Sequence, residues 1–168
     1  MRIKRLFSAA AAVILLISMC TVLAGCGYEI EADISSYQDT EIRITGLTDE
    51  NFIVTPAQLA ELKCEKETVK GAATGKTITA TAAGPTLAAF TEANGVELEE
   101  IKSVTVTASD GYTKTFDADY FITHPDVYMS LANGENALEK DEQPMRLIVP
   151  GAPADNWVRG VVQMDFVR

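Results

Sequence analysis

The sequence is poor in the residue types that build several common functional sites. It contains three cysteines, one tryptophan and a single histidine, His124, in 168 residues. The aspartates near it, Asp117, Asp119 and Asp126, do not form a spaced zinc-ligand set with it, so we interpret His124 as a turn residue. There is no EF-hand loop and no G-x-S-x-G nucleophile elbow, although a Ser-His-Asp triad in another arrangement stays open.

Basic residues are scarce as well. The chain has 14 lysines and arginines against 24 acidic residues, which makes a formal net charge of −10. Nucleic-acid-binding proteins neutralise phosphates with clustered Lys and Arg, so this balance argues against nucleic acid as a partner. With 47% hydrophobic residues the composition is that of a folded protein, and the length predicts one domain.

A Gly-Lys-Thr sequence at residues 75–77 invites comparison with a phosphate-binding P-loop. The P-loop motif requires a glycine five residues before the Gly-Lys pair, and that position is Lys70. The flanking segments 65–70 and 76–82 alternate in polarity, and the small residues 71–75 between them favour the turn of a β-hairpin. We therefore predict a hairpin here and no nucleotide site.

The first 26 residues have the pattern of a secretory signal. Three basic residues precede an apolar run, Leu6–Leu23, which ends at Leu-Ala-Gly-Cys. This ending resembles the bacterial lipobox, in which the signal is cleaved before the cysteine and that cysteine is lipidated. We predict a lipoprotein signal peptide at residues 1–25 and an acyl anchor on Cys26, holding the protein extracytoplasmically on the cell membrane or envelope. An uncleaved transmembrane anchor is the alternative, because the run is about long enough to span a bilayer.

Cleavage would change the cysteine inventory and the charge. Cys20 would leave with the signal and Cys26 would carry lipid, so Cys64 would be alone and no intramolecular disulfide could form. Loss of three basic residues would make the mature chain still more acidic. We predict that residues 26–40 comprise the lipidated cysteine and an acidic tether, with an edge strand as the alternative.

Residues 41–168 are expected to form one α+β domain. Thr55-Pro56 predicts the start of a short helix ending near Leu62, and residues 84–86 open a second helix that ends at Asn94-Gly95. Alternating apolar residues and turn signals predict a mixed, mostly antiparallel sheet. Its expected strands are residues 41–45, 52–54, 65–70, 76–82, 102–108, 112–116, 127–131, 145–149 and 157–167.

Several segments resemble the molybdopterin-binding domain of sulfite oxidase-type oxidoreductases. The most specific are QPMRLIVPG at 143–151 and NWVRGVVQMDF at 156–166, and the series also includes VTVTASDGYTKTF at 104–116. The resemblance implies that fold for residues 41–168. Enzymes of this family hold molybdenum through a pterin dithiolene and one Cys thiolate, and they clamp the pterin phosphate with basic side chains.

The resemblance places the phosphate clamp on Arg146 and Arg159, although either arginine could instead pair with a carboxylate. The metal-ligand cysteine is missing from its expected loop at residues 66–84. Cys64 lies upstream and is the candidate metal ligand, or else a small buried side chain. The acidic segment EKDEQ at residues 139–143 lies where it would repel a phosphate. Trp157 is expected to be a core residue or, alternatively, a ligand-stacking platform.

These departures predict a non-catalytic lipoprotein that binds a pterin-like or other small ligand without a required cofactor. Two alternatives stay open. One is an active molybdopterin-dependent oxidoreductase, and the other is a tethered accessory subunit of an envelope redox or transport complex. The expected partners are the lipid membrane through Cys26, a small ligand, and an envelope redox protein.

Overall fold

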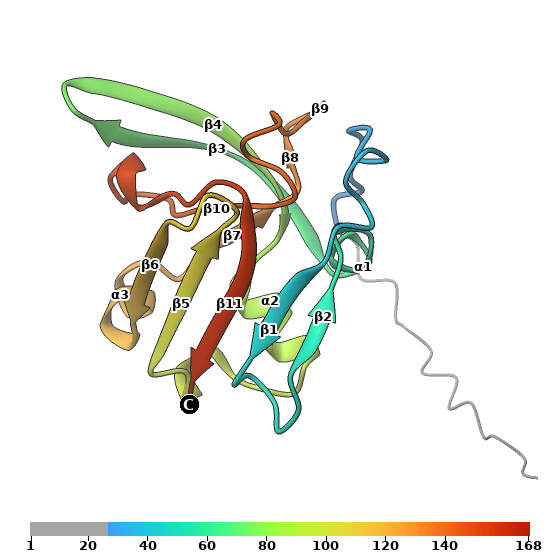
Figure 1. The fold of residues 1–168 in the computed structure, drawn as a ribbon. Coiled ribbons are helices and arrows are strands. Elements are labelled where there is room, and N and C mark those ends of the chain that lie inside the picture. Colours follow the sequence, from blue (N-terminus) through green and yellow to red (C-terminus); the bar gives the residue numbers. More distant parts are fainter. Residues whose placement is uncertain (1–26) are drawn as a thin grey trace, which may run out of the picture.

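A five-stranded sheet forms one layer of the domain in the computed structural model, which describes residues 27–168 (Figure 1). Its strand order is β2-β1-β11-β5-β6. β1 and β11 are parallel, and the other neighbours are antiparallel. The strands are β1 (Ile42–Thr45), β2 (Phe52–Val54), β5 (Ser103–Ala108), β6 (Thr113–Asp117) and β11 (Val161–Val167).

Alternating apolar residues explain how this sheet covers the core. In β5, Val104, Val106 and Ala108 are buried, while the residues between them are half-buried. This is the period-two pattern of a strand with one face toward the core. Phe90 of α2 (Leu87–Ala93) packs near Phe166 of β11, with ring centres 6.4 Å apart. The last strand of the domain therefore packs against α2 in the core.

A second sheet carries a long hairpin that projects from the body of the domain (Figure 1). Its order is β3-β4-β8-β9, with β3 (Cys64–Ala73), β4 (Lys76–Pro85), β8 (Ala132–Asn133) and β9 (Asn136–Ala137). The predicted hairpin is confirmed, and its strands are longer than the polarity pattern indicated. Residues 71–73, which resembled a loop, continue the strand pairing up to a two-residue turn at Thr74-Gly75. Residues 84 and 85, which resembled a helix start, extend β4 at its other end.

A short two-stranded sheet joins this hairpin to the segment that carries Arg146. It pairs β7 (Tyr128–Ser130) with β10 (Arg146–Ile148). β4 lies directly against β7, because a Cβ atom at Gly84 would be 2.2 Å from the carbonyl oxygen of Met129. A side chain at position 84 would therefore push the two strands apart.

Within residues 27–168, three short α-helices and two 3₁₀ turns connect the strands. The structure confirms both predicted helices: α1 (Pro56–Ala60) has a Thr55–Gln58 capping box, and α2 begins after Thr86. A third helix, α3 (Ala118–Thr123), forms where the sequence indicated a helical turn. The 3₁₀ turns are η1 (Leu98–Glu100) and η2 (Ala154–Asn156). None of the helices within residues 27–168 is long and apolar enough to cross a membrane.

The predicted final strand at 157–167 is wrong at its beginning. Residues 157–160 lie apart from the five-stranded sheet, where Val158 bridges to Leu147 of β10. Gly160 has a φ of +60°, a left-handed conformation that ends this segment before β11 starts at Val161. The change of direction places Trp157 and Arg159 beside β10, not in the large sheet.

The segment predicted as a tether packs against the domain. Tyr37 is buried; its hydroxyl donates to the Leu131 carbonyl at 2.7 Å and accepts from the Leu138 amide at 3.1 Å. Ala32 is buried against Ala83 and Ala132. The described part of the segment is thus neither a free tether nor an edge strand. The predicted signal peptide and the lipidation residue, Cys26, lie outside the described residues.

Candidate functional site

The two arginines singled out by the sequence converge on one buried carboxylate. Arg146 Nη1 donates to Glu142 Oε1 at 2.7 Å, and Arg159 Nε lies 3.5 Å from the same oxygen. The side chains of Arg146 and Glu142 are only 7% and 6% exposed. Both arginines pair with a carboxylate in this structure, which is one of the two roles that the sequence allowed for them.

Arg159 connects this buried pair to the surface. Its side chain is half exposed, and its Nη1 donates to the exposed carboxylate of Asp141 at 3.2 Å. Glu142 therefore lies between two guanidinium groups, and Asp141 neutralises the outer one. We call Asp141, Glu142, Arg146 and Arg159 the arginine cluster.

Backbone contacts between distant segments position the cluster. Leu147 of β10 and Val158 exchange two backbone hydrogen bonds of 2.8 and 3.1 Å. The Gly160 amide donates to the Glu142 carbonyl at 3.1 Å. These bonds hold the turn that carries Glu142, the strand that carries Arg146 and the segment that carries Arg159 side by side.

Trp157 forms one wall of the arginine cluster. The guanidinium carbon of Arg146 lies 5.3 Å from the centre of a Trp157 ring, within the range of a cation–π contact. The indole N–H donates to the Val149 carbonyl at 2.9 Å, and the side chain is 5% exposed. Gly71 of β3 lies against the indole, since a Cβ there would be 2.7 Å from it. The side chain is thus a core residue and has no free face for a stacked ligand.

Burial has an electrostatic cost at Arg146. Desolvation lowers the pKa of the guanidinium from its ordinary value, and the Glu142 carboxylate acts in the opposite direction. Arg146 Nε is buried and has no hydrogen-bond partner among the described residues. An arginine in a protein keeps its charge, so the Glu142 carboxylate is the main compensation for a buried cation.

Cys64, the candidate metal ligand, does not belong to this cluster. Its side chain is 1% exposed at the start of β3, and its Sγ lies 3.8 Å from each of the carbonyl oxygens of Leu59 and Ala60. Burial raises the pKa of the thiol to about 11. Metals bind the thiolate, so Cys64 has the character of a small buried core side chain.

We expect native Cys64 to react very slowly with iodoacetamide. At pH 8 a thiol with a pKa of about 11 is ionised in roughly one molecule in a thousand, and this one is also shielded from solvent. Alkylation followed by mass spectrometry at increasing pH measures the rate. The same protein in urea is the control and should react rapidly. Fast alkylation of the folded protein would mean that the thiol is accessible after all.

His124 ends α3 and stacks on Tyr120, with ring centres 4.5 Å apart. Its Nδ1 lies 3.2 Å from the Tyr120 carbonyl oxygen, and burial raises the pKa of the Tyr120 hydroxyl. The part of the chain that the structure describes contains no group of three or more His, Cys, Asp or Glu side chains placed to hold a metal ion.

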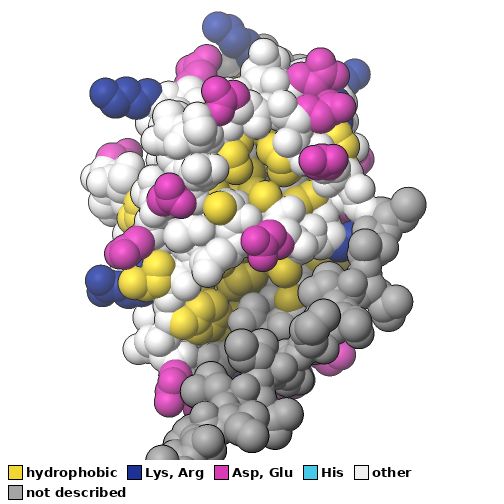
Figure 2. Space-filling model, turned by 90° about the vertical axis from the view of Figure 1, so that its right-hand side faces the viewer, with side chains coloured by type: hydrophobic (Ala, Val, Ile, Leu, Met, Phe, Trp, Pro, Cys, Tyr) yellow, Lys and Arg dark blue, Asp and Glu magenta, His cyan; other side chains and the backbone are white. Residues whose placement is uncertain are grey.

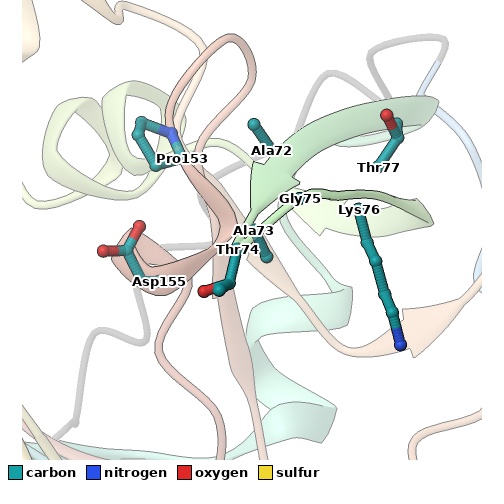
Figure 3. Close-up of a pocket in the computed structure, with 8 residues that line it drawn as sticks. All are labelled: Ala72, Ala73, Thr74, Gly75, Lys76, Thr77, Pro153 and Asp155. Carbon is teal, nitrogen blue, oxygen red and sulfur yellow. The ribbon is translucent and has the colours of Figure 1, made fainter.

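A cavity of about 500 Å³ lies beside the β3–β4 turn, where sequence reasoning had placed no site (Figure 3). The turn supplies one wall, and Pro153 and Asp155 of the η2 segment supply the other. Lys76 extends away from Asp155 in this view. Neither arginine of the cluster nor Cys64 lines this cavity. The cavity forms where the β3–β4 hairpin packs against a loop that is distant in the sequence. No sequence motif predicts a contact of this kind.

Comparison with known proteins places this fold. A family model described as the oxidoreductase molybdopterin binding domain matches residues 29–168. The crystal structure of the sulfane dehydrogenase SoxCD from Paracoccus pantotrophus is similar, with a TM-score of 0.64 and 19% sequence identity. The alignment covers 77% of this chain and 38% of that chain. No curated protein sequence matches the chain.

The structural similarity confirms the predicted fold class. The described residues form mostly antiparallel sheets with a few short helices, an α+β architecture similar to the sulfite oxidase-like molybdopterin domain. At 19% identity the similarity concerns the fold alone.

Proposed function

The chain belongs to the oxidoreductase molybdopterin-binding domain family, and from this premise we propose that it is a lipid-anchored, non-catalytic member that binds a small ligand outside the cytoplasm. One observation carries the non-catalytic part. The carboxylate of Glu142 already contacts both arginines that the family resemblance implies for phosphate binding. An anionic cofactor would have to displace that carboxylate from a buried position.

The residues of this chain do not fit a molybdenum pterin cofactor. The phosphate would approach Arg146 and Arg159 across Asp141 and Glu142, two carboxylates that already neutralise them. The metal would require a thiolate, whereas burial keeps the Cys64 thiol protonated at neutral pH. Both parts of the cofactor, its phosphate and its metal, therefore lack a suitable partner at these positions.

The cavity beside the β3–β4 turn is the better candidate for ligand binding. Its lining combines small side chains with the hydroxyls of Thr74 and Thr77 and the carboxylate of Asp155. A site of about 500 Å³ is within the range of small-molecule pockets, and these groups suit a polar ligand with hydrogen-bond donors.

The anchor rests on the first 26 residues. A basic start, the apolar run Leu6–Leu23 and the Leu-Ala-Gly-Cys ending together support cleavage before Cys26 and its acylation. This would place the domain on the outer side of the cell membrane or envelope. There it could also serve as the accessory subunit of a redox or transport complex.

One preparation tests both parts of the proposal. We expect protein expressed from the full-length sequence and extracted from bacterial membranes with mild detergent to begin at Cys26 and to carry an acyl group there. We also expect it to contain far less than one molybdenum per chain. Intact-mass and peptide mass spectrometry measure the first property, and inductively coupled plasma mass spectrometry measures the second.

Two variants serve as controls. Cys26→Ala should lose the acyl mass and the membrane association, and Cys64→Ala should leave the metal content unchanged. Stoichiometric molybdenum that disappears in Cys64→Ala would contradict the non-catalytic proposal and favour an active oxidoreductase. An intact Met1 terminus without acyl mass would contradict the lipid anchor. A protein partner that co-purifies stoichiometrically would favour the accessory-subunit alternative.

A further inference from the structure

The chain has almost no spacer between the proposed anchor and the folded domain. The Tyr28 amide donates a hydrogen bond of 2.8 Å to the Cys64 carbonyl. Gly27 lies against the same strand end, because a Cβ built on it would be 3.2 Å from that carbonyl oxygen and 3.5 Å from Lys63 Cα. Residue 27 is thus already in contact with the place where α1 ends and β3 begins.

We propose that this place, residues 61–65, lies directly on the lipid bilayer and that the β3–β4 turn faces away from it. We call residues 61–65 the α1–β3 corner. The inference rests on the proposed acylation of Cys26. It adds to that proposal an orientation of the domain and identifies the surface that meets the lipid.

Covalent geometry sets the distance. Adjacent Cα atoms are about 3.8 Å apart, so an acylated Cys26 stays next to Gly27 whatever its conformation. A flexible tether of the length expected from the sequence would have an end-to-end distance of about 20 Å. Residues 28–40 do not provide this reach, because Ala32 and Tyr37 are buried in contacts with the rest of the domain.

The hairpin gives the orientation. β3 runs from Cys64 at the corner to Ala73 near the turn, ten residues that extend for about 33 Å. Figure 1 shows the turn and α1 on opposite sides of the molecule. With the corner on the bilayer, the turn and the cavity beside it are directed toward the extracytoplasmic space. A soluble ligand or partner would reach the cavity there.

Charge does not explain attachment of this side of the domain. Around the corner, Glu29, Glu31 and Glu61 are exposed, and the nearby Lys63 pairs with Glu65 at 3.2 Å. Figure 2 looks onto the side that carries α1 and β2, and acidic side chains are spread across it between areas of hydrophobic surface. Anionic lipid would repel such a surface. The acyl chain therefore holds the domain, and added salt should not release it.

Two matched cysteine probes test the orientation. Lys63→Cys marks the corner and Lys76→Cys marks the turn; each replaces an exposed lysine. Cys64 is buried and contributes little background labelling. Each variant is expressed from the full-length sequence, and the purified acylated protein is labelled with an environment-sensitive fluorophore. It is then reconstituted into phosphatidylcholine vesicles that contain nitroxide-labelled lipid. We expect quenching by the lipid to be several-fold greater at position 63 than at position 76.

A spacer variant is the control. A Gly/Ser-rich insertion as long as the tether expected from the sequence, placed between Cys26 and Gly27, leaves all described residues in place. It supplies the reach that the native chain lacks, so it should remove most of the difference in quenching between positions 63 and 76. Equal quenching at positions 63 and 76 in acylated native-length protein would overturn the orientation alone. A protein without acyl mass would instead overturn the proposed anchor, and the orientation with it.

Discussion

Replacement of Glu142 with alanine is expected to lower the free energy of unfolding by about 3–5 kcal/mol, the usual cost of removing one partner from a buried ion pair. Glu142 is the buried carboxylate that contacts both Arg146 and Arg159. Without it, Arg146 would keep a buried charge beside another cation. Urea unfolding followed by circular dichroism measures the change, and a loss of this size would remove a large share of the stability of a typical domain.

Two further variants separate charge pairing from other effects. Asp141→Ala removes an exposed partner of Arg159 and should cost at most about 1 kcal/mol. A double variant, Glu142→Leu with Arg146→Met, removes both buried charges together. Its free energy of unfolding should be close to that of the native protein and higher than that of Glu142→Ala. If Glu142→Ala unfolded at the same urea concentration as the native protein, the buried pair would not be a major contributor to stability.

Replacement of Trp157 with alanine is expected to cost about 3–5 kcal/mol, as for other large aromatic side chains in a core. The indole fills space between Gly71 of β3 and Arg146 of β10, and its N–H donates to the Val149 carbonyl. Its removal would leave a cavity beneath a buried charge. Thermal and urea unfolding measured by circular dichroism report the loss without relying on the fluorescence of the missing tryptophan.

Trp157→Phe is the matched control. It keeps most of the ring volume and loses the hydrogen bond to Val149, so it should cost clearly less than the alanine variant. Equal losses for the two variants would mean that the hydrogen bond, and not packing, is the main contribution. A near-neutral Trp157→Ala variant would contradict the role of Trp157 as a core residue.

Local features of the fold could be predicted because their causes are local. The Thr55 cap needs only residues 55–58, and the Asn94-Gly95 helix end needs a residue that adopts a positive φ, as Gly95 does at +74°. The alternation in β5 likewise depends on one strand with one buried face. The resemblance of residues 143–151 and 156–166 to a known family was specific enough to identify the fold.

Where the prediction failed, a distant contact decided the conformation. The segment before residue 41 has little apolar periodicity, yet the Tyr37 hydroxyl hydrogen-bonds to the backbone of Leu131 and Leu138, which are far along the chain. The last strand starts later than expected because Val158 pairs with β10. The single contacts that Tyr37 and Val158 make with remote segments leave no regular pattern in the sequence around them.

The fold class, the acidic charge, the isolation of Cys64 in the proposed mature chain and the interest of the two arginines all follow from the sequence. The contacts that these residues make depend on the tertiary structure. Glu142 and Arg146 are four residues apart, a spacing that predicts pairing on a helix, but here one is in a turn and the other in a strand. Their pairing arises because the chain buries both, and a buried cation requires a buried partner. The same packing places the Cys64 thiol out of solvent and holds Gly27 against the α1–β3 corner.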